Sequence, residues 1–142
     1  MFRATKEFKR DMAHRLPTHW WKCFNVHWHT YKALITIQAL NLQEEWVETW
    51  MIKDFSNFKP IKEWIDENWD HSYVGVYNDE VLDFLESKKF RTYTMKKNPT
   101  AENMAKLLYE KSKELLEWVW VVKVVIYETP TSFAEYSEDL PF

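Results

Sequence analysis

The sequence of 142 residues contains almost no glycine: there is a single one. Average usage of about 7% would give roughly ten. Tryptophan, normally among the rarest residues, occurs nine times. The glycine deficit and the tryptophan excess are of similar size, which suggests that tryptophan stands at some positions suited to glycine.

Cysteine is also scarce, and neither a basic excess nor a long apolar run is present. One cysteine excludes an internal disulfide framework and indicates a reducing compartment, so we expect a cytoplasmic protein. The net charge of −3 argues against general nucleic-acid binding, which favours a strongly basic surface. No apolar run is long enough to span a bilayer, and the charged start MFRATKEFKR does not resemble a signal peptide. We therefore expect neither a nucleic-acid nor a membrane partner.

What is present is the composition of a soluble globular protein, with 46% hydrophobic and 29% charged residues. The length suits one domain, residues 1–142, with a sizeable core. No repeat, low-complexity tract or Gly/Pro/Ser-rich linker divides the chain.

The hydrophobic pattern predicts four strands and two helices. Alternation or β-branched runs predict the strands, at residues 5–14, 31–42, 118–128 and 132–138. Helical spacing predicts the helices, at residues 54–69 and 98–117, and Pro60 is tolerable only in the first turn. Residues 71–97 give no clear assignment. The order predicts an α+β domain, with an antiparallel four-stranded sheet and two helices on one face.

The stretch HWWKCFNVHWHT, residues 19–30, combines features of a metal site. On a strand, His27 and His29 leave the same face, and each imidazole can offer a nitrogen to zinc at about 2.0–2.1 Å. His14, from the neighbouring strand, can supply a third. Three histidines with an open fourth position are typical of a catalytic zinc site. The alternative is a pair of ordinary histidines on a half-exposed strand.

Three further residues are candidates for catalysis. Three roles are open for Cys23. It is a fourth metal ligand, which would close the site; or a free thiol, which a base or a cation must activate; or an inert core residue. Asp70 directly precedes His71, and an aspartate can orient an imidazole as in a catalytic triad. The alternative for this pair is a solvated feature at a helix end.

Glu128 ends an apolar strand. By alternation it shares a face with Val124 and Ile126, so its carboxylate needs a partner. A ligand with paired N–H donors would supply one. Otherwise the side chain bends to water.

Six stretches together carry a family resemblance: AHRLP, KCFNVHWH, WMIKDF, DH, NPTAEN and YETPTSFAEY. In this order and approximate spacing, the chain resembles the 6-pyruvoyl-tetrahydropterin synthase / 6-carboxy-5,6,7,8-tetrahydropterin synthase family over nearly its whole length. The Cys-x-x-x-His-x-His spacing is similar to that of the carboxy branch, because the pyruvoyl branch has a longer gap there.

The resemblance implies a role for each candidate residue. It implies that Zn²⁺ is held by His14, His27 and His29. It implies that Cys23 is a catalytic base, activated with help from Asp70 and His71. It also implies that Glu128 anchors the pterin, with Thr100 and Glu102 near the same pocket. For the triphosphate group, Lys22 and Arg15 are the candidate cations.

The resemblance also implies a fold, an assembly and a reaction. The fold is the tunnelling fold (T-fold), whose subunits join their strands into an oligomeric barrel, commonly a homohexamer of two stacked trimers with shared active sites. The substrate is 7,8-dihydroneopterin triphosphate. The products are 6-carboxy-5,6,7,8-tetrahydropterin, acetaldehyde and triphosphate, on the route to 7-deazaguanine nucleosides such as queuosine. The alternatives are a 6-pyruvoyl-tetrahydropterin synthase and a zinc- or pterin-binding subunit without activity.

Four tryptophans depart from the family pattern in one way. The family has glycine where this chain has Trp21, Trp28 and Trp50, and Trp46 lies in a turn-like stretch suited to glycine. We hypothesise that these are UGA codons translated as tryptophan, from a source that reads UGA as glycine. The zinc motif would then be His-Gly-His. Genuine tryptophans would put activity in doubt, and UGG at these codons would contradict the hypothesis.

Overall fold

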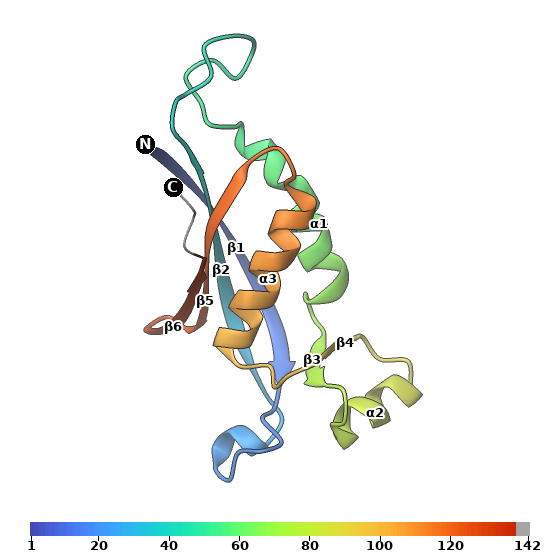
Figure 1. Ribbon diagram of the computed structural model, residues 1–142. Helices are drawn as coiled ribbons and strands as arrows, with labels where there is room; N and C mark the ends of the chain where they lie inside the picture. Colours follow the sequence, from blue (N-terminus) through green and yellow to red (C-terminus); the bar gives the residue numbers. More distant parts are fainter. Residues whose placement is uncertain (139–142) are drawn as a thin grey trace.

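The computed structural model describes residues 1–138 (Figure 1). The strands are β1 (Phe2–His14), β2 (His27–Ala39), β3 (Tyr73–Val76), β4 (Thr92–Met95), β5 (Trp120–Thr129) and β6 (Ser132–Ser137). The helices are α1 (Lys59–Asn68), α2 (Glu80–Ser87) and α3 (Ala101–Leu115), with two short 3-10 helices, η1 (Lys22–Phe24) and η2 (Phe55–Phe58).

All the strands join one mixed sheet in the order β4-β3-β1-β2-β5-β6. The pairs β1–β2, β2–β5 and β5–β6 are antiparallel, and β3 lies parallel to both β1 and β4. The four predicted strands are therefore confirmed, but the prediction of a four-stranded antiparallel sheet is wrong, because residues 1–138 form six strands. The two additional strands lie in the unassigned segment. Each has four residues, too few for a clear alternation.

The helices α1 and α3 lie side by side on one face of the sheet (Figure 1). Their inward residues join those of the strands in one core, which includes Ile35, Ile37, Ile61, Ile65, Met104, Leu108, Val124 and Ile126. The prediction of two helices on one face is incomplete, since the structure adds α2 beside β3 and β4. In residues 1–138, no helix is long and apolar enough to cross a bilayer.

Local sequence explains where the helices begin. Pro60 lies in the first turn of α1, where its missing N–H removes no helical hydrogen bond. The Thr100 hydroxyl accepts from the backbone N–H of Asn103 at 3.2 Å and caps α3. Asp79 caps α2 in the same way through the N–H of Val81, at 3.0 Å.

The nine tryptophans fall into two groups in the structure. Trp64 and Trp69 pack together with ring centroids 5.2 Å apart, and both contact Tyr93. The others are 54–87% exposed: Trp20, Trp21, Trp28, Trp46, Trp50, Trp118 and Trp120.

Backbone geometry distinguishes the four tryptophans that stand at expected glycine positions. Trp46 and Trp50 have φ values of 69° and 65°, in the left-handed region that favours glycine. Trp21 has φ −115°, which any residue adopts, and Trp28 lies within β2. The backbone therefore favours glycine at positions 46 and 50 but does not require it at 21 or 28.

Candidate metal centre and active site

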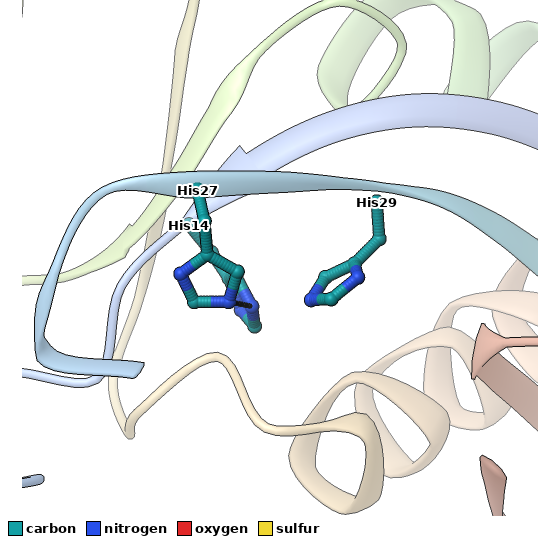
Figure 2. Close-up of side chains that lie close together, drawn as sticks. All are labelled: His14, His27 and His29. Atoms are coloured by element: carbon teal, nitrogen blue, oxygen red, sulfur yellow. Dashed lines mark hydrogen bonds between the residues drawn. The ribbon is translucent and has the colours of Figure 1, made fainter. Parts of the chain in front are cut away.

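Three histidines meet where β1 ends and β2 begins (Figure 2). His14 is the last residue of β1 and pairs directly with His27, the first residue of β2. His29 lies two residues further along β2, so strand alternation places it on the same face. Figure 2 shows the rings converging on one space, and their ligand nitrogens all lie within 4.8 Å of one another.

Backbone carbonyls orient two of the rings. Nδ1 of His14 lies 2.8 Å from the carbonyl oxygen of Pro99, and Nδ1 of His27 lies 2.7 Å from that of Asn25. A carbonyl can only accept, so each Nδ1 carries the donated proton and each Nε2 presents a lone pair. These two Nε2 atoms are 2.9 Å apart. Nε2 of His29 is buried without a hydrogen-bond partner in the described residues. This donor set fits a metal ion.

Burial keeps two of the imidazoles in the form that binds metals. The pKa of His14 is lowered to about 4, mainly by burial and also by the nearby His27 and His29, against the opposing effect of the hydrogen bond to Pro99. Burial also lowers the pKa of His29, although the Glu128 carboxylate opposes this shift. Both rings are therefore neutral at neutral pH, and a neutral imidazole is a metal ligand.

Glu128, near the end of β5, lies beside this triad. Its Oε1 is 3.4 Å from Nε2 of His14 and 3.6 Å from Nε2 of His29. It also borders a cavity of about 220 Å³ with Thr100 and Glu102. The structure thus brings together the three residues predicted to bind substrate, next to the three predicted metal ligands.

A second cavity, of about 500 Å³, also borders Glu128. Its lining includes Trp28, His29 and two lysines that sequence reasoning missed, Lys9 and Lys32. The lysines pair directly across β1 and β2. Along each strand the lysine alternates with core residues. This alternation is the only sequence signal that could have predicted that the lysines line this cavity.

Cys23 lies in η1, within the connection that follows β1. Its thiol is free and partly buried, and its backbone carbonyl accepts from the N–H of Leu16 at 2.7 Å. The metal-ligand cluster found in residues 1–138 contains the three histidines and not Cys23. A fourth-ligand role for Cys23 therefore gains no support.

Asp70 and His71 form a pair at the end of α1. Nδ1 of His71 is 2.9 Å from Oδ1 of Asp70, and the His71 side chain is 73% exposed. The backbone N–H of His71 donates to the carbonyl of Asp11 in β1 at 2.8 Å, which holds the pair beside this strand. Within the described chain, no hydrogen bond or ion pair joins this pair to Cys23 or to the histidine triad.

The two cations suggested for triphosphate differ in their surroundings. Arg15 is 7% exposed, and its Nε donates to Asp79 at 2.8 Å. Asp79 also accepts from the Tyr73 hydroxyl at 2.5 Å. Its guanidinium is thus engaged in a buried ion pair, which does not favour Arg15 as a ligand of the triphosphate. Lys22 is exposed in η1.

Comparison with known proteins gives consistent results. Residues 3–139 match the family model described as 6-pyruvoyl tetrahydropterin synthase. A 6-carboxy-5,6,7,8-tetrahydropterin synthase from Haemophilus influenzae is 34% identical, over 97% of this chain and 100% of its own. The enzyme of the same name from Rickettsia bellii is 37% identical, over 95% and 99% of the two chains.

Solved structures share the fold. A protein from Wolinella succinogenes, described as uncharacterized, superposes with a TM-score of 0.80 at 20% identity, over 97% of this chain and 98% of its own. The 6-pyruvoyl tetrahydropterin synthase of Caenorhabditis elegans superposes with a TM-score of 0.70 at 22% identity, over 97% and 96%. With the family model and the bacterial relatives matching almost end to end, the chain belongs to the 6-pyruvoyl tetrahydropterin synthase family of enzymes.

Proposed function

We propose that the protein is a zinc-dependent 6-carboxy-5,6,7,8-tetrahydropterin synthase. It would convert 7,8-dihydroneopterin triphosphate to 6-carboxy-5,6,7,8-tetrahydropterin, acetaldehyde and triphosphate, in the cytoplasm and as a step toward 7-deazaguanine nucleosides. The observation that carries the proposal is the histidine triad beside a cavity that Glu128, Thr100 and Glu102 line. The names of the bacterial relatives support the carboxy branch.

The metal ligands would be Nε2 of His14, His27 and His29. Zn²⁺ is the metal that three imidazoles with one further position commonly bind in enzymes. When bound, it would polarise the hydroxyl groups of the substrate side chain as a Lewis acid. The carbonyls of Pro99 and Asn25 hold two of the rings in the required tautomer.

The pterin ring would occupy the cavity of about 220 Å³. A carboxylate can accept two parallel hydrogen bonds from a guanidine-like edge, as it does from arginine. Glu128 is 32% exposed at its side chain, so it can reach such an edge. Thr100 keeps its hydroxyl proton available as a donor, because its oxygen only accepts in the helix cap.

Proton transfer would involve Cys23 as the base, with Asp70 and His71 from another copy of the chain. Within residues 1–138 no hydrogen bond or ion pair joins this pair to Cys23, and a site shared between two chains would account for this. The unpaired edges support a barrel, because among residues 1–138 β1 meets β3 only at Ala13 and His14, and β6 is the last strand of the sheet. We therefore propose a homohexamer built from two trimers.

A second candidate is a subunit that binds zinc without turnover. Trp28 is 77% exposed and lines the cavity next to His29 and Glu128. An indole in this place can fill space that a substrate needs. The pyruvoyl branch is a further candidate that differs in its product.

The test is to incubate zinc-loaded protein with 7,8-dihydroneopterin triphosphate and identify the products by mass. 6-Carboxy-tetrahydropterin with acetaldehyde is expected. A pyruvoyl product would move the protein to the other branch, and bound zinc without any product would favour the inactive subunit. Cys23→Ala is the matched variant: it should keep its zinc and lose turnover, whereas His27→Ala should lose both.

A further inference from the structure

We propose that Glu128 is the fourth metal ligand in the substrate-free protein and leaves the metal when a pterin ring enters. The first half concerns metal binding alone. The second part of the proposal rests on the proposed function, because it names a pterin ring as the ligand that draws Glu128 away from the metal.

The position of the carboxylate supports the role of Glu128 as a metal ligand. In a tetrahedral site with bonds of about 2.0–2.1 Å, neighbouring ligand atoms lie about 3.3–3.4 Å apart. Oε1 of Glu128 is 3.4 Å from Nε2 of His14 and 3.6 Å from Nε2 of His29. These two separations are close to the spacing of neighbouring ligands on one metal ion. Glu128 lies outside the cluster in which all ligand atoms are within 4.8 Å of one another, so the side chain, 32% exposed, would have to turn toward His27 to complete the site.

A simple hydrogen bond explains this contact less well. Charge-assisted N–H···O bonds measure about 2.7–2.9 Å, shorter than both separations. The proton on Nδ1 of His14 is donated to Pro99, so the Nε2 lone pair faces the carboxylate. Nε2 of His29 has no hydrogen-bond partner in the part of the chain that the structure describes. A lone pair on His14 and an anionic oxygen repel one another, and a metal ion between them would turn this repulsion into attraction.

The same carboxylate is accessible from the neighbouring cavity. Glu128 borders it together with Thr100 and Glu102. A guanidine-like edge that donates two N–H bonds uses both carboxylate oxygens. Binding such an edge would therefore take Glu128 from the metal and open the fourth position to a substrate hydroxyl. The metal would be exposed only after the correct ring has docked.

The first experiment uses protein loaded with Co²⁺ and follows its visible absorption during titration with imidazole. Imidazole is neutral, so the loss of one negative charge does not by itself alter its binding. Wild-type protein should resist imidazole, and Glu128→Ala should bind it at least tenfold more tightly. Co²⁺ itself should dissociate at least tenfold more readily from Glu128→Ala, as measured by competition with a chelator.

Glu135→Gln is the control. Glu135 lies on β6 and pairs with Lys123, away from the triad, so this variant should behave as wild type. Equal imidazole binding by wild type and Glu128→Ala would overturn the proposal, as would an unchanged Co²⁺ affinity. Circular dichroism checks that Glu128→Ala is folded, and Glu128→Gln, which keeps the side-chain volume, should show the same changes.

The second experiment tests the release of Glu128. Pterin, without side chain or phosphates, should allow imidazole to bind the Co²⁺ site of the wild type. 2,4-Dioxopteridine, which lacks the 2-amino group and hence the guanidine-like edge, should not. No effect of pterin would overturn the second half alone. Turnover is measured separately, so a failure of the proposed reaction remains distinguishable from a failure of the metal experiment.

Discussion

At the scale of single residues, two tryptophans hold a backbone conformation that costs free energy. A side chain in the left-handed region costs about 1–2 kcal/mol relative to the right-handed one. Trp46 and Trp50 adopt this region at 87% and 72% exposure. Their indoles therefore gain little burial to offset the cost.

Glycine at these two positions should stabilise the protein. We expect Trp46→Gly and Trp50→Gly each to raise the free energy of unfolding by about 1 kcal/mol, as measured by urea denaturation followed by circular dichroism. Trp21→Gly is the control: its backbone is extended, so glycine should bring no gain. A loss of stability in the first two variants would contradict the argument and weaken the hypothesis of reassigned codons.

The buried ion pair of Arg15 and Asp79 gives a second residue-scale prediction. Asp79→Asn keeps a side chain that can cap α2 but leaves the buried guanidinium with only the exposed Glu80 carboxylate, at 3.9 Å, as a counter-charge. We expect a loss of about 3–5 kcal/mol of unfolding free energy. Asp66→Asn is the control, because Asp66 pairs with Arg10 at a partly exposed site and should cost about 1 kcal/mol or less. Similar losses in both variants would show that the buried Arg15 pair contributes no more to the free energy of unfolding than the partly exposed Arg10 pair.

At the scale of elements, the connection between β2 and η2 is organised by one carboxylate. Four donors converge on Glu48: the backbone N–H of Asp54 at 2.8 Å, and the side chains of Lys53 at 2.9 Å, Asn57 at 2.9 Å and Gln43 at 3.2 Å. The Asp54 N–H and the Lys53 ammonium lower the pKa of Glu48 to about 2.

This shift predicts how the connection responds to acid. The folded pKa lies below the ordinary value of 4.5, so the stabilisation is complete above about pH 4.5 and is lost as the pH falls toward 2. Protection of the Trp50 N–H, which donates to the Gln43 carbonyl at 2.7 Å, should fall across this window in hydrogen exchange. In Glu48→Gln the protection should be weaker throughout and independent of pH there. A wild-type protection that stays constant would contradict the assignment.

The sequence pattern predicted the long elements and the histidine triad because both depend on local periodicity. Alternation along β2 places His27 and His29 on one face, and the same rule places Glu128 with Val124 and Ile126. The short strands β3 and β4 were not predicted because four residues are too few to show a period: β3 is buried throughout, and β4 has one buried residue. The contact of Glu128 with the triad was also beyond prediction, since it depends on the register between β2 and β5.

At the scale of the whole molecule, we expect two chains to contribute residues to each active site. Cys23→Ala and His71→Ala should each be inactive. When the two variants are dissociated, mixed in equal amounts and reassembled, about a quarter of the shared sites should contain both native residues. Activity should return to about that fraction of the wild-type value. No recovery, with mixed oligomers demonstrated by mass, would place both residues in the same chain's site.

The exposed tryptophans also determine how this protein can be observed. Most of its indoles already sit in water when the chain is folded, so their fluorescence should shift little on unfolding. Trp69, which is buried, and the partly buried Trp64 should contribute a minor, blue-shifted component that alone reports the state of the core. A flat emission curve during denaturation would therefore be compatible with complete, cooperative unfolding.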